Sequence, residues 1–409
     1  MSVDGSRVTT KSEWECRQEE INTLFQTFEL GTKPGAPSVF SPTFSDNTLS
    51  ITAGDGTTSI SFSASITYRS ENAASYPALI AFQGGSLPTP SGVAIINFDN
   101  DDLAAEKDES SRGMGKFYTL YGSNATASAM MAWAWGVSRV VDALETLPVS
   151  EHKIDVTHLG VTGCSRDGKG ALLAGAFDTR IVLTIPQESG SGGDACWRLS
   201  NFCNANLAYS NGQTVQSSSE IVTENDWFSV KFAEQFANNV NTLPLDHHSL
   251  AALVAPRGLF VIENTEYEWL GPWSCYGCMK TASKVWQALG IQDNMGFSQI
   301  GDHPHCEFPS SQQSDLNAYV GKFLLGQNTN TSIFRTDLPS NETFDESVWA
   351  PWTVPTLIRA SLPARSLFLK SYKTRNLIYY TSKASYILLI QYVYMVGHDA
   401  MILILATRS

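Results

Sequence analysis

Short apolar runs alternate along this chain with longer segments in which apolar residues recur at helical spacing. Five of the apolar runs predict buried β-strands, at residues 79–83, 93–98, 158–163, 181–186 and 258–264. The longer segments predict helices over residues 127–147, 169–177, 278–290 and 314–325. Strands that alternate with helices favour a mostly parallel sheet with helices on both faces. We therefore predict an α/β fold, a three-layer αβα sandwich around a mostly parallel central sheet.

This alternating pattern stops near Trp352. From residue 353 the chain carries seven Lys or Arg and one Asp, whereas the first 352 residues carry 20 basic and 39 acidic side chains. The apolar run at 386–406 is interrupted by three polar residues, which argues against a membrane span. We predict one domain over residues 8–340 and a C-terminal tail, 341–409, that is not part of the fold. A membrane-surface anchor is the alternative for this tail.

The composition excludes some classes of function. The 409 residues are 43% hydrophobic and 11% aromatic, with a net charge of −13, so the chain can form the core of one large domain. A sequence-independent nucleic-acid binder needs basic patches, and the acidic balance therefore argues against nucleic acid as a partner. A neutral ligand or a polysaccharide suits this composition better.

Cysteines and glycosylation sequons indicate an oxidising compartment. The N-terminus, MSVDGSRVTTKSEWECRQEE, lacks the apolar segment typical of a signal peptide. The seven cysteines match no zinc template, because Cys275 and Cys278 form a C-x-x-C with no second pair. Sequons at Asn124, Asn330 and Asn341 fit secretion. We predict a secreted, extracellular protein whose signal peptide is not visible in this chain.

The stretch VTGCSRDGKGAL, residues 161–172, carries the first chemical signal. It leaves a predicted strand, turns at Gly163, exposes Ser165 and enters a predicted helix, which is the pattern of a nucleophile elbow. The helix N-terminus behind the serine offers N–H groups to a developing oxyanion. In the usual G-x-S-x-G pattern the second glycine comes one residue earlier than Gly168 does here. The alternative is a serine that caps an ordinary strand–helix turn.

A serine hydrolase of this architecture needs an acid and a histidine later in the chain. Glu188 follows a predicted strand, and His303 and His305 follow a later one. The carboxyl ends of parallel strands meet at one edge of the sheet, so these residues favour a Ser–Glu–His triad there. Their order leaves both histidines open as the base. The two histidines at 247–248 lie in a helix-like run, which indicates structural roles.

Longer motifs give a family resemblance over about residues 14–337. The stretches that carry it are VTGCSRDGKGA, PQESGSGGDACWR, DHHSLAALVAPRGL, ENTEYEWLGPWSCYGCM and HCEFPSSQQ. Together they resemble fungal glucuronoyl esterases, carbohydrate esterase family 15. The resemblance implies an α/β-hydrolase fold with Ser165 as the nucleophile, Glu188 as the acid and His305, the second histidine of H-x-H-C, as the base. It also implies that Arg166 stabilises the oxyanion through its backbone N–H and guanidinium.

The same resemblance implies a serine-type carboxylic ester hydrolase. Enzymes of this family cleave esters between 4-O-methyl-D-glucuronic acid on xylan and alcohols of lignin. The implied mechanism forms an acyl-enzyme on Ser165 and requires no metal and no organic cofactor. We therefore expect glucuronoxylan and lignin–carbohydrate esters as substrates, a monomer, and neither nucleic acid nor a membrane as a partner.

Four further positions resemble sugar-binding residues of the family, namely Lys169, Gln216, Glu224 and Trp269. The lysine lies one helical turn after Ser165 and would donate to sugar oxygens. The glutamine and the glutamate would bind hydroxyls, and the tryptophan would pack near the sugar ring. Gln213 is a rival of the glutamine, and Trp273 is a rival of the tryptophan.

The resemblance also implies two disulfides, Cys164–Cys306 and Cys196–Cys278. The first would join the neighbour of the nucleophile to the neighbour of the base and so hold the geometry between them. Cys203 and Cys275 are candidates for a third bridge. Cys16 is left over, and we expect it to be a free thiol.

Three other functions stay open. An acetyl xylan or feruloyl esterase would share the triad but not Lys169 or the stretch EWLGPW. A non-catalytic carbohydrate-binding protein would keep aromatic side chains but lack part of the triad, all of which is present here. Cys164 could act as a thiol nucleophile with His305 as its base, although the disulfide implied for this cysteine disfavours that role.

Overall fold

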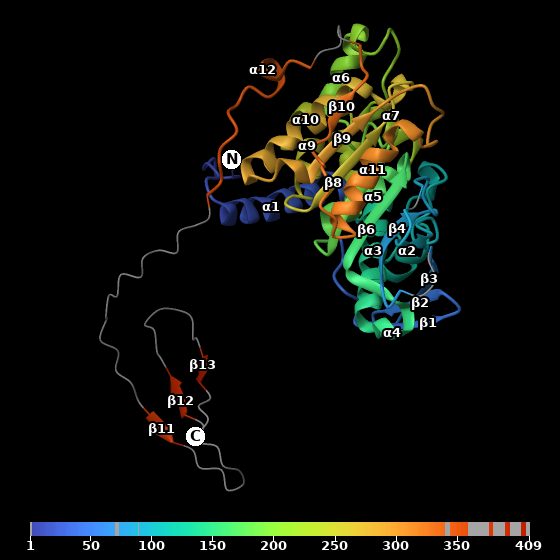
Figure 1. The fold of residues 1–409 in the computed structure, drawn as a ribbon, viewed down its shortest axis with the longest axis vertical. Helices are drawn as coiled ribbons and strands as arrows, with labels where there is room; N and C mark the ends of the chain where they lie inside the picture. The colour runs from blue at the N-terminus through green and yellow to red at the C-terminus, as the bar shows by residue number, and fades with distance from the viewer. Residues whose placement is uncertain are drawn as a thin grey trace. The chain divides into compact units, whose positions relative to one another are not determined.

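The computed structural model of this chain describes residues 2–69, 73–88, 90–339 and 344–358, together with the backbone of three short strands beyond residue 375. The chain divides into two compact units, Met1–Arg359 and Ala360–Ser409. The first unit contains the large sheet and every site residue that the sequence predicts (Figure 1).

The first unit is built on one sheet of ten strands in the order β1-β2-β3-β5-β4-β6-β7-β8-β9-β10. The strands from β5 to β10 in this order are parallel to their neighbours, whereas β1, β2 and β3 form an antiparallel edge next to β5. The five strands that the sequence predicts are β4 to β8. The bounds are β1 Val39–Ser45, β2 Thr48–Gly54, β3 Ser59–Thr67, β4 Tyr76–Phe82, β5 Ala94–Phe98, β6 Ile154–Cys164, β7 Ile181–Gln187, β8 Gly258–Glu263, β9 Met295–Gln299 and β10 Phe334–Thr336.

Helices cover both faces of this sheet (Figure 1). Successive residues of β4 point to opposite faces, so Ala78 and Ile80 lie in one buried core and Leu79 lies in a second. The first core includes α1, α3, α5, α9 and α10, and the second includes α11. The predicted three-layer α/β sandwich is confirmed. The helices are α1 Lys11–Phe25, α2 Lys116–Tyr121, α3 Ala129–Thr146, α4 Val149–His152, α5 Arg166–Phe177, α6 Trp197–Ala205, α7 Ser218–Glu224, α8 Val230–Gln235, α9 His247–Ala252, α10 Pro272–Leu289, α11 Gln313–Phe323 and α12 Glu346–Trp349.

The antiparallel edge of the sheet was not among the predicted strands. Residues of β3 alternate strictly between exposed and buried positions, as expected for a strand with one face on the core and one face in water. Its exposed positions are Ser and Thr, so the stretch contains no apolar run of the kind that marks β4 to β8. The signal was present as a period of two residues rather than as a block of apolar side chains.

The described residues beyond the predicted boundary at 340 contact the first unit. The ring of Phe344 lies 5.6 Å from that of Trp273, and the ring of Trp349 lies 4.7 Å from that of Phe202. Further along, the Leu357 N–H donates to the backbone oxygen of Ala288 at 2.9 Å. The compact unit therefore extends to Arg359.

The second unit contains three short antiparallel strands, β11 Asn376–Ile378, β12 Leu389–Tyr392 and β13 Ile402–Leu405. The remainder of the predicted tail from residue 359 lies outside the described residues, so the expectation that this tail is not part of the fold stays a prediction. Among the helices that the structure describes, none combines the length and the apolar character that crossing a bilayer requires.

Two truncations test the predicted boundary at residue 340. A chain that ends at residue 340 keeps the parallel sheet and every predicted site residue, so we expect it to fold and keep its activity. It loses the buried Phe344, whose apolar burial is worth about 2 kcal/mol, so its melting temperature should fall below that of a chain ending at Arg359. Differential scanning calorimetry measures the difference. Loss of soluble expression in the chain that ends at Arg359 would show that the residues beyond it are part of the fold.

Candidate active site

The turn between β6 and α5 forces Ser165 into a strained backbone conformation, with φ 60° and ψ −126°. Its N–H donates to the Gln187 backbone oxygen at 2.9 Å, which ties the turn to the end of β7. A Cβ on Gly163 would lie 2.3 Å from the Asp167 backbone oxygen, and one on Gly168 would lie 2.6 Å from that of Gln187. Both glycines are needed for close approach. Gly168, which comes one residue later than in the usual pattern, therefore lies against the end of β7.

Arg166 is the first residue of α5. Its backbone N–H has no acceptor within the helix because it belongs to the first turn, and the positive end of the helix dipole lies at this point. Its guanidinium lies over the indole of Trp227, with 5.2 Å between the Cζ atom and the ring centroid. The backbone N–H of Arg166 thus lies immediately beside Ser165, and its guanidinium lies against Trp227.

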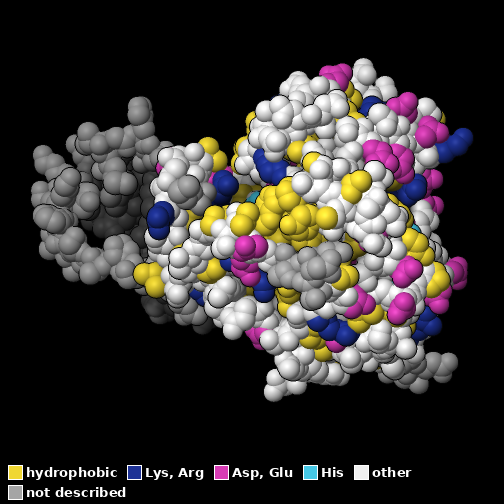
Figure 2. Space-filling view, turned by 90° about the horizontal axis from the view of Figure 1, so that it is seen from above, with side chains coloured by type: hydrophobic (Ala, Val, Ile, Leu, Met, Phe, Trp, Pro, Cys, Tyr) yellow, Lys and Arg dark blue, Asp and Glu magenta, His cyan; other side chains and the backbone are white. Residues whose placement is uncertain are grey.

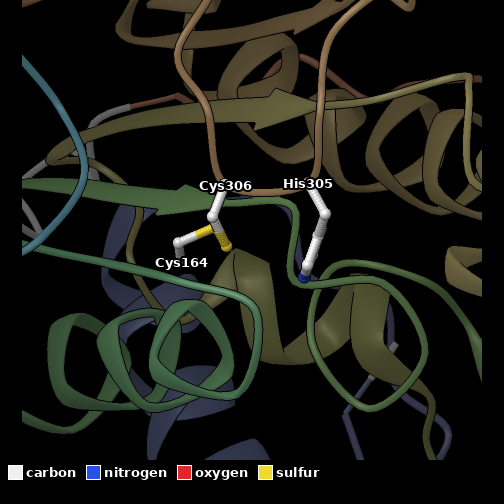
Figure 3. Close-up of side chains that lie close together, drawn as sticks. All are labelled: Cys164, His305 and Cys306. Carbon is white, nitrogen blue, oxygen red and sulfur yellow. A yellow bond between two sulfur atoms is a disulfide. The ribbon is translucent and has the colours of Figure 1, made fainter.

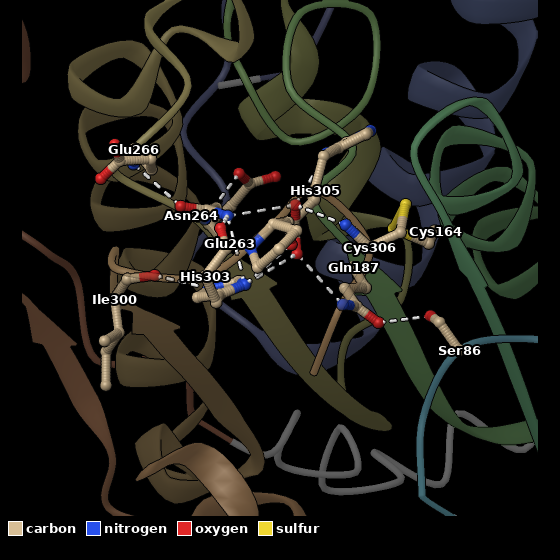
Figure 4. Close-up of polar contacts among 12 residues, drawn as sticks. Ser86, Cys164, Gln187, Glu263, Asn264, Glu266, Ile300, His303, His305 and Cys306 are labelled. Carbon is tan, nitrogen blue, oxygen red and sulfur yellow. Dashed lines mark hydrogen bonds and ion pairs between the residues drawn. A yellow bond between two sulfur atoms is a disulfide. The ribbon is translucent and has the colours of Figure 1, made fainter. Parts of the chain in front are cut away.

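Glu188 follows β7 directly and is fully buried, with a positive φ of 45°. The Nδ1–H of His305 donates to its Oε2 at 2.7 Å, and the Cys306 N–H donates to the same oxygen at 3.0 Å. Gln187 Nε2 donates to Oε1 at 3.1 Å (Figure 4). Burial raises the pKa of the Glu188 carboxyl, but these hydrogen bonds outweigh burial and hold the pKa below its ordinary value. Glu188 is therefore a carboxylate at neutral pH.

The two candidate histidines have different surroundings. His303 Nε2–H donates to the Ile300 backbone oxygen at 2.9 Å, and its Nδ1 accepts from Asn264 Nδ2 at 3.3 Å (Figure 4). Both ring nitrogens of His303 thus have hydrogen-bond partners. His305 uses only Nδ1, and its Nε2 has no hydrogen-bond partner among the described residues. In the tautomer that Glu188 selects, Nε2 carries a lone pair and can accept a proton.

A disulfide joins the two sides of this arrangement. Cys164 and Cys306 are bonded, with their Cα atoms 5.8 Å apart and a sequence separation of 142 residues (Figure 3). Because Cys164 precedes Ser165 and Cys306 follows His305, the bond fixes the backbone next to the elbow to the backbone next to the imidazole. Closing a loop of this length in the unfolded chain is worth on the order of 4–5 kcal/mol in the chain-entropy view.

The other cysteines correct one expectation. Cys196 and Cys278 are bonded, as the resemblance implies, and Cys16 is an exposed free thiol. The suggested bridge between Cys203 and Cys275 is wrong, because the structure does not join them. The Cys275 sulfur is directed instead toward the Leu270 backbone oxygen, at 3.7 Å.

The four positions that resemble sugar-binding residues form one group, in which Trp269 lies against His305. Gln216 Nε2 donates to Glu224 Oε2 at 2.5 Å, and the Gln216 N–H donates to the Trp269 backbone oxygen at 3.0 Å. The Trp269 ring lies 4.9 Å from the imidazole of His305, nearly perpendicular to it, and Trp269 is 39% exposed. Lys169 completes the group, because the charge of Glu224 acts on its ammonium. The structure thus connects these residues to one another and to the imidazole.

The two rivals lie in different settings. Trp273 is 1% exposed and packs against the rings of Phe202 and Tyr209, so it belongs to the core. Gln213 is exposed, and its described hydrogen bonds are backbone contacts with Ser210. The geometry favours Gln216 and Trp269 over them.

Lys169 is a cation held almost entirely out of water. It is 4% exposed, and its Nζ donates to the Ser189 backbone oxygen at 2.5 Å. Burial lowers the pKa of this ammonium to about 8, although the charges of Glu263, Asp194 and Glu224 act to raise it. The proton on Lys169 is therefore held less firmly than that of an ordinary lysine.

Figure 2 shows one face of the molecule, on which hydrophobic side chains gather into a central patch with acidic and basic side chains around it. A family model described as "Glucuronyl esterase, fungi" matches residues 51–290 of the chain. A 4-O-methyl-glucuronoyl methylesterase of Hypocrea jecorina is 58% identical over 354 residues, which cover 87% of this chain and 74% of that protein. The chain belongs to the fungal glucuronoyl esterase family.

Solved structures agree with this assignment. The glucuronoyl esterase catalytic domain from Hypocrea jecorina superposes with a TM-score of 0.82 at 57% identity, covering 87% of this chain and 95% of that one. A serine-to-alanine mutant of the glucuronoyl esterase from Sporotrichum thermophile, in complex with methyl 4-O-methyl-β-D-glucopyranuronate, superposes with a TM-score of 0.82 at 46% identity, covering 87% and 94%. The esterase is thus a carboxylic ester hydrolase of α/β-hydrolase fold, which excludes the non-catalytic alternative.

Two groups of potential metal ligands occur among the described residues of the esterase. In one, His305 lies beside the two bonded cysteine sulfurs. The other comprises Asp194, Glu263 and Cys275, all buried. Burial and the neighbouring Asp194 raise the pKa of Glu263 well above its usual range. The two carboxyls already accept hydrogen bonds, Glu263 from the Gly190 N–H and Asp194 from Ser189 Oγ. Neither group therefore supports a metal site.

Several residues that support the site carry no obvious sequence signal. Asn264 Nδ2 donates to the His303 backbone oxygen at 3.1 Å, and Ser86 Oγ donates to Gln187 Oε1 at 2.6 Å. Trp227 packs under Arg166 from a distant loop. For Asn264, the exception, the polar pair Glu263–Asn264 at the end of the run 258–264 was a usable signal.

An open groove of about 520 Å³ borders the imidazole of His305. It lies between the loop after β4 and the loop that carries the histidine, and its apolar walls are Leu87, Pro88, Pro304 and Phe308. The esterase thus offers space beside the imidazole in addition to the group formed with Trp269.

Proposed function

We propose that this esterase hydrolyses ester bonds between 4-O-methyl-D-glucuronic acid side chains of xylan and lignin alcohols, through an acyl-enzyme on Ser165. The observation that carries the proposal is the 2.7 Å hydrogen bond from His305 Nδ1 to the buried Glu188, beside a strained serine at a strand–helix turn. Relatives at 58% and 54% identity, which are named 4-O-methyl-glucuronoyl methylesterases, support the class of substrate.

The proton transfers follow from the tautomer of His305. Its Nε2 takes the proton of Ser165 Oγ as that oxygen attacks the uronoyl carbonyl, and Glu188 stabilises the resulting imidazolium. The tetrahedral intermediate collapses, the ester C–O bond breaks, and Nε2 gives the proton to the departing alcohol oxygen. Water then attacks the acyl-enzyme while Nε2 takes one of its protons. That proton returns to Ser165 Oγ when the uronic acid is released.

Arg166 has the role of stabilising the oxyanion. Negative charge develops on the carbonyl oxygen during both attacks, next to the N-terminus of α5. The backbone N–H of Arg166 and its guanidinium are donors within this first turn. Removing one such donor typically costs about 100- to 1,000-fold in rate.

The uronic acid is placed against Lys169, Gln216, Glu224 and Trp269. The ammonium and the glutamine amide can donate to sugar oxygens, and the carboxylate of the glutamate can accept from hydroxyls. The half-exposed indole offers an apolar surface beside the imidazole. The leaving alcohol is placed in the groove beside His305. Phe308 and Pro304 line this groove, so an aromatic alcohol finds apolar contact there.

The same reasoning extends to partners and location. The sequons at Asn124 and Asn330 are exposed, whereas Asn341 lies outside the described residues. Two disulfides suit an oxidising environment, and the net charge of −13 disfavours binding to nucleic acid. We therefore infer a secreted monomer that acts on glucuronoxylan and lignin–carbohydrate esters, without a membrane or nucleic-acid partner.

The main experiment compares two epimeric substrates. We expect the esterase to cleave methyl or benzyl esters of 4-O-methyl-glucuronate and to cleave the galacturonate esters about 10- to 100-fold less efficiently, because the wrong epimer leaves a buried polar group unpaired. The measurement is kcat/KM by release of the alcohol. Ser165→Ala should abolish both activities. Equal kcat/KM for the two epimers would contradict the proposed sugar site, and release of acetate from acetylated xylan would favour an acetyl xylan esterase.

The two histidines provide a matched pair of substitutions. His305→Ala removes the proton carrier, so kcat should fall by about 100-fold or more. His303→Ala removes the hydrogen bonds to Ile300 and Asn264 and a 3.9 Å approach of Nδ1 to Glu188 Oε1, but it leaves the hydrogen bond from His305 to Glu188 in place. This variant should keep most of kcat, with a lower melting temperature. Steady-state kinetics of both variants on methyl glucuronate tests the assignment. Equal losses of kcat in both variants would contradict His305 as the sole base.

The pKa of Lys169 sets an expected pH dependence. Below about pH 8 the side chain is charged and donates strongly to the sugar, and above that pH it becomes neutral. KM should therefore rise as the pH increases through about 8, after subtraction of spontaneous hydrolysis. Lys169→Met should raise KM and remove this rise. Lys322→Met, which removes contacts with Asp293 and Thr331 outside the proposed site, should keep it. A rise that persists in Lys169→Met would point to another group.

A further inference from the structure

The cationic side chains of Arg166 and Lys169 both pack against the indole ring of Trp227. The Arg166 Cζ atom lies 5.2 Å from the ring centroid of Trp227, and the Lys169 Nζ atom lies 5.5 Å from it. The two residues are three positions apart in the first turn of α5, so they share one face of the helix. Like charges this close repel each other, and a shared aromatic surface attracts both.

The indole itself is fixed by its surroundings. Trp227 is 3% exposed, and its Nε1–H donates to Glu106 Oε2 at 3.2 Å. Asn225 Nδ2 donates to the Glu106 backbone oxygen at 2.7 Å, which fastens the loop that carries this acceptor. Burial and the nearby charge of Asp167 raise the pKa of the Glu106 carboxyl to about 8, so Glu106 is largely uncharged at neutral pH.

The mode of contact suits a donor that must stay available. The described hydrogen bonds and ion pairs of the chain include none from the guanidinium of Arg166. Its stacking on Trp227 restrains the position of the planar group through its face, whereas a hydrogen bond or an ion pair would use some of its five N–H donors. A guanidinium held in this way is oriented and still free to donate to an oxyanion. Lys169, by contrast, also donates to the Ser189 backbone oxygen.

We propose that Trp227 is a positioning residue that holds the guanidinium of Arg166 and the ammonium of Lys169 in a fixed relation, and that Glu106 holds the indole in place. This inference rests on the proposed function, in which Arg166 stabilises the oxyanion and Lys169 binds the sugar. Trp227 acts through these two cations and does not itself touch the substrate. Its loss should lower kcat through Arg166 and raise KM through Lys169.

A double-mutant cycle tests the link to Arg166. We expect Trp227→Leu to lower kcat on methyl glucuronate by about 10-fold, since a desolvated cation–π contact has this magnitude. In an Arg166→Ala background the same substitution should lower kcat by less than about twofold, because the group it positions is gone. Trp227→Phe keeps a weaker aromatic face, so its loss of kcat should lie between about twofold and about 10-fold. If Trp227→Leu does not fold, Trp227→Phe carries the same cycle with a smaller expected loss.

Glu106 offers a second, conservative pair of substitutions. Glu106→Gln preserves a neutral side chain with an oxygen acceptor for the indole and should keep kcat within about twofold. Glu106→Ala removes the acceptor and should approach the kcat loss of Trp227→Leu. A kcat preserved in Glu106→Gln would show that Glu106 orients the indole and that its charge is not needed. A kcat loss as large in Glu106→Gln as in Glu106→Ala would overturn the role given to Glu106.

A distant tryptophan serves as the control for a purely structural effect. Trp286 is fully buried and its Nε1–H donates to the Arg257 backbone oxygen at 3.0 Å, so it matches Trp227 in burial and bonding. Trp286→Leu should lower the melting temperature and leave kcat of the folded enzyme unchanged. Equal kcat losses for Trp227→Leu with and without Arg166 overturn the inference while leaving the proposed function standing. A kcat unchanged in Arg166→Ala overturns the oxyanion role on which the inference rests.

Discussion

The close approach of the β6–α5 turn to the end of β7 is the constraint on which this site depends. Ser165 N–H reaches the Gln187 backbone oxygen, and the backbone at Gly168 passes so near that same oxygen that a Cβ would overlap it. The next residue along β7 is Glu188, whose carboxylate accepts from His305. One contact therefore sets the position of the serine relative to the acid, and the acid sets the imidazole. The disulfide from Cys164 to Cys306 also joins the backbone beside the serine to the backbone beside the imidazole.

The second constraint is electrostatic. The first turn of α5 carries two cations, one of them almost wholly buried, at the positive end of a helix. Such charges are costly to bury unless opposite charges or hydrogen bonds accompany them. Glu263, Asp194 and Glu224 act electrostatically on Lys169, and the ring of Trp227 contacts both cations. The same low-dielectric setting strengthens each donor toward a developing oxyanion, so the cost of burial and the proposed chemistry have one origin.

Local signals in the sequence were enough for the parallel part of the fold and for the elbow. The apolar runs of β4 to β8 and the glycine turn around Ser165 depend on neighbouring residues, so they can be read from a short stretch. The sequence alone left His303 and His305 equivalent, because the difference comes from Ile300 and Asn264, which occupy both nitrogens of one ring. The family resemblance, not spacing, favoured the histidine that the geometry also favours.

Contacts between distant segments were out of reach of pattern reasoning. Glu106 and Trp227 are 121 residues apart, and nothing near either residue signals that they meet. The suggested bridge between Cys203 and Cys275 was wrong for a related reason. Pairing leftover cysteines ignores the direction of each side chain, and the Cys275 sulfur faces the Leu270 oxygen and buried carboxyls.

The length of the acidic side chain has a physical explanation in this arrangement. The carboxylate at position 188 must extend from the end of β7 to the Nδ1 of His305 and the N–H of Cys306, and it meets both with one oxygen. An aspartate would draw the carboxylate back by about 1.5 Å, one C–C bond length. A 2.7 Å hydrogen bond would not survive that shift unless the backbone moved, and the disulfide and the Ser165–Gln187 contact hold the backbone on both sides. The extra methylene of glutamate is therefore a consequence of which strand carries the acid.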